Sequence, residues 1–308
     1  MRLIAFLFIL IPSLCLAQFD PAGGESGSKA VHRDDMTTAR WADSVVFNPG
    51  WKNISDTTQG RVEAGLIDDV LGAANNRTLS FGDGGTATFY YDQPIIDVEG
   101  PDIVVFENGF AWSGGYFLEL AFVEVSSDGN RYVRFPSVSS ADTSDQIGNL
   151  AYMECQWYHN FAGKHQAPYG TPFDLSELRD SSIDLSDIHY IRLIDVVGAL
   201  NDSIGNRDSK GNLINDPWPT GFENGGFDLD AVGVMRFPLS IADTDISQMP
   251  NPVSTGSDVN FEKPHNIQLF DLSGKLILER SDNSFAAPAI PGLYIVSIDN
   301  SIYKLCVQ

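Results

Sequence analysis

The sequence is poor in basic residues, in cysteine and in long apolar runs. Its 308 residues include 19 lysines and arginines against 41 acidic residues, a formal net charge of −22. Nucleic acids and anionic membrane surfaces carry charge of the same sign, so the composition argues against both as partners. No segment reaches the roughly 20 apolar residues that a membrane-spanning helix needs. We therefore expect no nucleic-acid partner and no transmembrane segment.

Disulfide and catalytic motifs are also lacking. The three cysteines, at positions 15, 155 and 306, are too few and too widely spaced for a disulfide framework. The histidines show no HExxH spacing, and no GxSxG elbow or Cys/His pair is present. Helix patterns are few, namely Leu175 to Arg179 after the N-cap candidate Asp174, and Glu63 to Val70. We expect a protein that is not an enzyme.

Residues 1–17 have the three parts of a cleavable secretory signal peptide. Arg2 is positive, residues 3–11 are all apolar, and Ala17 supplies the small residue before the cleavage point. Leu14 is bulkier than the residue that a lipobox places before its cysteine, which argues against lipidation of Cys15. We expect an extracellular protein or one on the outer cell surface.

Short apolar segments separated by turn residues predict β-strands over most of the remaining chain. The first of them alternates polar and apolar residues with the strand period of two. Asp128-Gly129 predicts a hairpin turn. We predict an all-β sandwich over residues 18–239, with long loops at 136–187 and 199–226. The predicted strands are residues 86–91, 103–106, 117–125, 131–135, 190–197 and 229–237.

The tail differs in composition and contains four motifs in a fixed order. Residues 240–249 have little apolar content and predict a linker, and residues 250–308 predict a small β unit. The motifs are PNP at 250–252, LFDLSGK at 269–275, GLY at 292–294 and a closing Lys304. They resemble the type A C-terminal sorting domain of the type IX secretion system. The resemblance implies the type IX secretion machinery as a partner; a generic small immunoglobulin-like β-sandwich is the alternative.

The main domain resembles an uncharacterised family of bacterial cell-surface proteins, through segments such as LSFGDGG at 79–85, GPDIVVFENGF at 100–110 and GFDLDAVG at 226–233. That family has no established activity to carry over. An association of its members with outer-membrane receptor genes, including those for cobalamin, hints at a role in uptake.

A broader similarity concerns the order of the predicted strands. The succession VEVSSDG at 123–129, YIRLID at 190–195 and FDLDAVGV at 227–234 is similar to that of galactose-binding-like jelly rolls, such as discoidin and carbohydrate-binding modules. In several of those modules an acidic residue of the closing strand helps to hold a structural calcium ion. Asp230 matches that position best, with Asp228 beside it.

A second calcium candidate is the loop from Asp208 to Asp216. It places a carboxylate at each end, with Gly211 between them, so its oxygens could fold inward around a cation. The loop does not match the EF-hand pattern. A plain loop in which Asp and Asn side chains cap backbone amides is an equal alternative.

Aromatic residues in or near predicted loops are candidates for ligand binding. A rigid ring there could stack on a sugar or another flat ligand, or it could be part of the core. Glu107 and Asn108 follow a buried strand and could point into the same site. The aromatic candidates are Trp112, Tyr116, Trp157 and Trp218.

These observations predict a secreted or cell-surface binding module for a glycan or a small nutrient ligand. A glycan-cleaving enzyme is one alternative, because Glu107 could pair with Glu119 or Glu124 as acid and nucleophile. An accessory protein of an outer-membrane nutrient receptor is another. Glu107 and a second carboxylate in a deep cleft would favour the enzyme, whereas a shallow aromatic surface would favour binding.

Overall fold

The computed structural model describes residues 19–36, 39–112, 114–149, 151–179, 181–235, 251–271, 275–298 and 301–308. The predicted signal peptide with Cys15, and the predicted linker, lie outside the described residues. Contacts divide the chain into two compact units, with the boundary between Arg236 and Phe237. The regular elements of the described residues are β-strands and short 3-10 helices, so the prediction of an all-β protein is confirmed.

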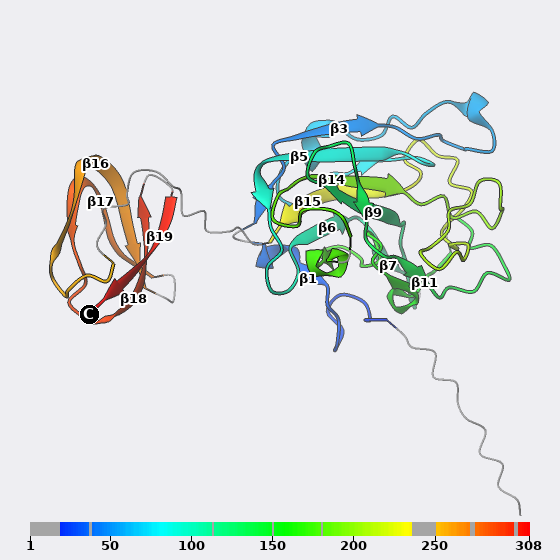
Figure 1. Cartoon of the computed structure of the whole chain (residues 1–308). Helices are drawn as coiled ribbons and strands as arrows, with labels where there is room; N and C mark the ends of the chain where they lie inside the picture. Colours follow the sequence, from blue (N-terminus) through cyan, green and yellow to red (C-terminus); the bar gives the residue numbers. More distant parts are fainter. Residues whose placement is uncertain are drawn as a thin grey trace, which may run out of the picture. The chain divides into compact units, whose positions relative to one another are not determined.

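The main unit contains two antiparallel sheets that form a β-sandwich (Figure 1). The first sheet has the order β1-β13-β6-β15-β2, with β4 also paired to β15. Its strands are β1 Val31–His32, β2 Arg40–Trp41, β4 Leu79–Ser80, β6 Ile103–Glu107, β13 Tyr169–Phe173 and β15 Asp228–Val234. The second sheet has the order β10-β9-β14-β5-β3. Its strands are β3 Ser44–Asn48, β5 Thr86–Ile95, β9 Ala121–Ser126, β10 Val133–Arg134 and β14 Ile188–Asp195.

The core lies between these sheets and follows from the strand period of two. Along β5, Phe89 and Tyr91 are fully buried while the residues between them are partly exposed. They share one apolar cluster with Val105 of β6 and Val232 of β15 in the facing sheet. The Tyr91 hydroxyl also donates a hydrogen bond to the Val232 carbonyl, at 3.1 Å. The two inner faces therefore form a single core.

Two smaller hairpins lie outside the main sheets. The first pairs β7 (Phe110–Trp112) with β8 (Gly115–Phe117), and the second pairs β11 (Val138–Ser139) with β12 (Tyr158–His159). The predicted single strand over residues 117–125 is thus interrupted at residues 118–120, between β8 and β9. The prediction of one long loop at 136–187 was wrong, because this range contains β11, β12 and β13. Strand β13 was not predicted because Gly170 and Pro172 are unusual inside a strand and interrupt its apolar pattern.

The predicted helices are only single 3-10 turns. Residues 63–70 supply η3 (Ile67–Val70), and the second prediction corresponds to η5 (Leu175–Leu178). Asp174 caps η5 as predicted, because its carboxylate accepts the Ser176 amide at 2.9 Å. The remaining turns are η1 Arg33–Asp35, η2 Thr57–Gln59 and η4 Cys155–Trp157. No helix among the described residues is long and apolar enough to cross a membrane.

The tail unit is a four-stranded antiparallel sheet with its own core. The order is β17-β16-β18-β19, and the strands are β16 Asp258–Phe270, β17 Leu276–Ala286, β18 Gly292–Ile298 and β19 Ser301–Val307. Val259, Leu269, Phe285 and Val296 are almost fully buried in one cluster. Residues 272–274 of the LFDLSGK motif lie outside the described residues. The jelly-roll and immunoglobulin-like assignments of the two units stay predictions.

The two cysteines of the described residues are free, as predicted. Cys155 is buried, and burial raises the pKa of its thiol to about 12. That thiol stays protonated at neutral pH and behaves as a small core residue.

The buried alternation of β5 makes a direct prediction about stability. Replacing Phe89 with alanine removes a fully buried ring and leaves a cavity, so Phe89→Ala should lower the free energy of unfolding by about 3–5 kcal/mol. Val46→Ala on the neighbouring strand β3 is the control, because Val46 is 64% exposed. It should cost less than about 0.5 kcal/mol. Urea unfolding of both variants measures the difference, and equal losses would contradict the assigned core.

Candidate functional site

The hairpin β7–β8 carries large aromatic residues on its surface. Phe110 pairs with Phe117 and Trp112 pairs with Gly115. Because alternate residues of a strand share a face, Phe110, Trp112 and their two partners lie on the same side. Trp112 is 62% exposed and Phe110 is 47% exposed. The Phe110 and Phe117 rings stack with their centroids 5.3 Å apart.

Tyr152 extends this surface from a different part of the chain. Gly115 has no side chain, and the Cβ of Tyr152 lies 2.7 Å from the place where a Gly115 Cβ would stand. Tyr152 is 37% exposed. We call Phe110, Trp112, Phe117 and Tyr152 the aromatic face. Only Trp112 of these four was predicted from the sequence as a ligand-binding residue. The grouping of the other three depends on the hairpin register and on the approach of Tyr152 from another part of the chain.

The other predicted aromatic residues are not on the aromatic face. Tyr116 occupies the opposite side of the hairpin, where its hydroxyl donates to Glu25 at 2.9 Å. Trp157 is half-buried and packs edge-on against Tyr158. Trp218 is also half-buried, and its backbone amide donates to the Ile147 carbonyl at 3.0 Å.

The hairpin begins and ends next to buried carboxylates. Glu107 is the last residue of β6 and is 1% exposed, and Glu119 follows β8 and is 4% exposed. Three further buried acids are close enough for their negative charges to raise the pKa values of this pair or of one another. We call the whole set the carboxylate cluster: Glu107, Glu119, Asp195, Asp216 and Asp228.

Burial and mutual repulsion raise the pKa values of these acids. Burial, followed by the charge of Asp228, raises the pKa of both Glu107 and Glu119 well above the usual range. Burial likewise raises the pKa of Asp195 to about 8 and that of Asp228 to about 6. The largest charge effects on Glu107 and Glu119 come from other carboxylates. The cluster therefore favours either bound protons or a bound cation.

Two oxygens of the carboxylate cluster are buried without a hydrogen bond among the described residues. They are Oε1 of Glu107 and Oδ1 of Asp216. The other oxygen of each has a backbone donor, since the Gly109 amide donates to Glu107 Oε2 at 2.7 Å and the Leu120 amide to Asp216 Oδ2 at 3.4 Å. A buried acceptor without a partner is costly, so a proton or a ligand atom at either oxygen would stabilise the cluster.

The remaining two aspartates of the cluster are already hydrogen-bonded. Asp228 accepts from the Ser80 hydroxyl and, at 3.2 Å, from the side-chain amide of Asn108. Asp195 accepts the backbone amides of Gly84 and Phe227, at 2.9 and 2.8 Å. Asn108 thus contacts the carboxylate cluster through Asp228, and its role in ligand binding stays a prediction.

The four predicted metal-binding aspartates separate into two kinds. Asp216 and Asp228 belong to the carboxylate cluster. Asp208 instead accepts backbone amides, including those of Lys210 and Asn212 at 2.9 Å, which is the capping alternative for its loop. Asp230 accepts the amides of Asn75 and Asn76. The pairing of β15 with β6 shifts in register between Leu229 and Ala231. Such a β-bulge changes the direction of the side chain between them, which is that of Asp230.

A separate acidic triad was not anticipated. Asp97, Asp102 and Asp174 each place an oxygen within 4.8 Å of the other two. Burial raises the pKa of Asp102 to about 6. Arg179 already pairs with Asp97, at 2.9 Å. Sequence spacing could not bring these residues together; only Asp174 stood out, as a helix cap.

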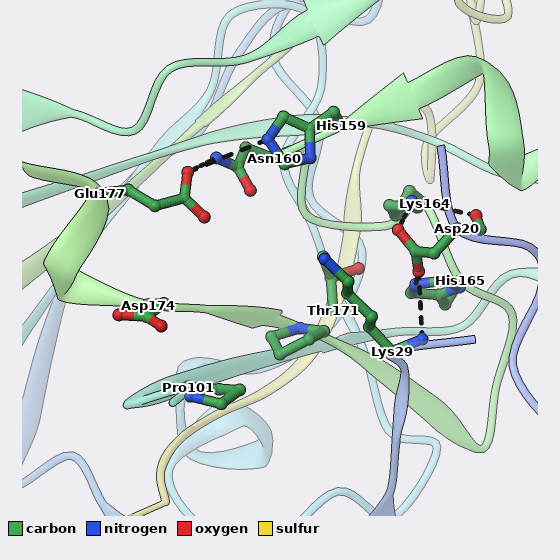
Figure 2. Close-up of a pocket in the computed structure, with 11 residues that line it drawn as sticks. Asp20, Lys29, Pro101, His159, Asn160, Lys164, His165, Thr171, Asp174 and Glu177 are labelled. Carbon is green, nitrogen blue, oxygen red and sulfur yellow. Dashed lines mark hydrogen bonds and ion pairs between the residues drawn. The ribbon is translucent and has the colours of Figure 1, made fainter. Parts of the chain in front are cut away.

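A third polar feature is a buried ion pair beside a cavity (Figure 2). The Lys164 ammonium donates to Asp20 Oδ1 at 2.7 Å, and His165 Nε2 lies 3.2 Å from Asp20 Oδ2. Lys164 and His165 are 2% and 1% exposed. Burial alone would raise the pKa of Asp20, but the His165 contact and the Lys164 charge hold it far below the usual range. Asp20 therefore supplies the counter-charge for Lys164, whereas burial lowers the pKa of His165.

Comparison with models of known protein families finds none that matches the chain. A search of curated protein sequences also finds no match.

The Asp20 ion pair predicts a pH-dependent loss of stability. Asp20→Asn leaves buried Lys164 without its counter-charge and should lower the free energy of unfolding by about 3 kcal/mol at pH 7. Because the pKa of Asp20 is lower in the folded state than its unfolded value of about 3.9, this stabilisation is present above about pH 4 and is lost as pH falls further. Guanidinium unfolding at pH 7, 4 and 3 should show the two proteins converging.

The matched control for this test is Asp202→Asn. Asp202 pairs with Arg207 but is 80% exposed, so its loss should cost less than about 0.5 kcal/mol at every pH. An Asp20→Asn protein as stable as the control would show that the pair is not important for the fold.

Proposed function

We propose that the main domain is a non-enzymatic binding module of the cell surface that holds a glycan on the aromatic face. The observation that carries this proposal is the grouping of four aromatic residues on one exposed side of the β7–β8 hairpin. Exposed apolar groups of this kind are unusual unless they bind something. The flat faces of Trp and Tyr rings suit the apolar side of a sugar ring. The similarity of strand order to carbohydrate-binding modules supports the same ligand class.

The burial of the acids favours binding over glycan cleavage. A glycosidase needs a carboxylic acid in contact with the glycosidic oxygen. Glu107 and Glu119 are both less than 5% exposed. Glu124 is engaged by two arginines, since Nε of Arg134 and Nε of Arg192 each donate to it at 2.8 Å. These acids suit a supporting role better than a catalytic one.

The second part of the proposal is a structural calcium ion at the carboxylate cluster, although among the described residues only the acidic triad brings three carboxylate oxygens within 4.8 Å of one another. Calcium prefers a shell of carboxylate and carbonyl oxygens, and the unpaired oxygens of Glu107 and Asp216 would supply ligands of that type. Asp228 lies within electrostatic range of both glutamates. When bound, the ion would offset the repulsion in the cluster and so fix both ends of the aromatic hairpin. Neutralisation by protons is the alternative, and the acidic triad is the competing ion site.

Delivery to the surface completes the proposal. The signal-peptide pattern and the tail motifs together fit export through the inner membrane and then through the type IX machinery. The separate core of the tail unit supports a role as an independent sorting domain.

The glycan proposal predicts the effect of removing one ring. Stacking of a sugar on an aromatic ring contributes on the order of 1 to 2 kcal/mol. Trp112→Ala should therefore weaken glycan binding about tenfold or more, and because Trp112 is exposed it should not change the melting temperature. Phe222→Ala is the control, because Phe222 is an exposed aromatic residue, 47% accessible, that lies in the loop before β15 and not on the aromatic face. A glycan array, followed by calorimetry on the best ligand, measures the change. Equal binding by Trp112→Ala and wild type would refute the aromatic face as the site.

The calcium proposal predicts stabilisation by the ion. At a calcium concentration 100 times its dissociation constant the fold gains about 2.7 kcal/mol. For a unit of this size, adding EDTA should therefore lower the melting temperature by about 5–10 °C. Glu107→Gln should abolish that difference, whereas Asp97→Asn should leave it intact. If Asp97→Asn abolishes it instead, the triad is the ion site; if EDTA changes nothing, no structural calcium is present.

A further inference from the structure

The cavity beside Asp20 is a second site, distinct from the aromatic face. It measures about 430 Å³, within the range of small-molecule sites. Its walls come from the segment that starts at Phe19, from β12 and the following loop, from β13 and from η5 (Figure 2). Polar side chains predominate among the residues that line it: Asp20, Lys29, His159, Asn160, Lys164, His165, Thr171, Asp174 and Glu177.

Two lysines line this cavity, together with three acidic side chains. Lys29 and Lys164 line the cavity in a protein with a formal net charge of −22. Lys164 is committed to Asp20. The Lys29 side chain instead extends into the space enclosed by the labelled residues (Figure 2), and no hydrogen bond or ion pair of its ammonium is described. The Lys29 ammonium is thus available to a negatively charged group.

An unsatisfied buried hydroxyl lines the same cavity. Thr171 is 3% exposed, and its Oγ1 has no hydrogen-bond partner among the described residues. A buried hydroxyl without a partner is expensive to maintain. Because Thr171 lies on β13 within the first sheet, its position is fixed by strand pairing and does not depend on a loop.

Acceptors lie on the η5 side of the cavity. Glu177 on η5 is held by the side-chain amide of Asn160 and lies 3.9 Å from His159 Nε2. Asp174 also lines the cavity, and one of its oxygens accepts the Ser176 amide. A ligand here would meet donors from Lys29 and Thr171 and acceptors from Glu177 and Asp174.

We propose that this cavity binds a small ligand that carries a carboxylate together with hydroxyl or ammonium donors. Lys29 and Thr171 hold the carboxylate by a charge-assisted and a neutral hydrogen bond, and Glu177 accepts from the donors. Acidic sugars and short peptides or amino acids share this chemistry, and both fit the volume. None of the residues of the aromatic face lines the cavity, so this proposal does not depend on glycan binding at the aromatic face.

Calorimetric titration of the full chain tests this proposal with three probes. D-glucuronate represents the acidic sugars, alanyl-alanine represents the amino-acid class, and D-glucose is the neutral parent without a carboxylate. We expect binding of at least one of the first two and at least tenfold weaker binding of glucose. Which of the two binds identifies the ligand source. Absence of binding by both, or equal binding of glucose, overturns the proposal.

Substitutions place the binding in this cavity. Lys29→Ala should weaken binding of the carboxylate probe at least tenfold, whereas Lys210→Ala, which removes an exposed lysine that does not line the cavity, should not. Thr171→Val should weaken binding and Thr171→Ser should restore it. Should Thr171→Val fail to fold, the Lys29 comparison still decides. Unchanged affinity in Lys29→Ala refutes the site, and Trp112→Ala should bind the probe as wild type does.

Discussion

The cost of burying negative charge is the constraint on which the rest of the main unit depends. Five carboxylates of the carboxylate cluster are at most 6% exposed, and a buried carboxylate is tolerated only when it is protonated, hydrogen-bonded or paired with a cation. The protein meets this demand partly with backbone amides, such as those that donate to Asp195. It leaves Glu107 and Asp216 each with one unpaired oxygen. These two oxygens without hydrogen bonds distinguish the cluster from ordinary core packing and make it a candidate binding site.

The position of the cluster links the sandwich to the exposed hairpin. Glu107 ends a strand of one sheet and Glu119 precedes a strand of the other, so the eleven intervening residues are held at both ends by the core. The hairpin itself has only two short strands and would have little stability alone. A rigid base with an aromatic surface above it is an arrangement that can bind a flat ligand without ordering a loop first, which keeps the entropic cost of binding low.

Local sequence patterns predicted much of the fold and little of the site. Alternation along β5 and the Asp128-Gly129 turn were sufficient for the sandwich, because strand period and turn chemistry are local properties. The aromatic face depends on the register that pairs Trp112 with Gly115, and on Tyr152 from elsewhere in the chain. Asp228 and Asp230 would share one face of a regular strand, but β15 has a register shift between Leu229 and Ala231 and the two side chains have different hydrogen-bond partners. Long-range register and bulges are not written in any short motif.

The ion pair of Asp20 with Lys164 also has a consequence for the order of folding. The two residues are 144 positions apart, so joining them closes a very long loop at an entropic cost of about 4 kcal/mol. The walls that receive Asp20, on β12 and the following loop, have to be in place before that cost is repaid. The segment that starts at Phe19 should therefore dock late and detach early. Because Asp20 and Lys29 of this segment line the neighbouring cavity, a ligand bound there would hold the segment in its docked position. The ligand would then make the first twenty described residues more resistant to proteases.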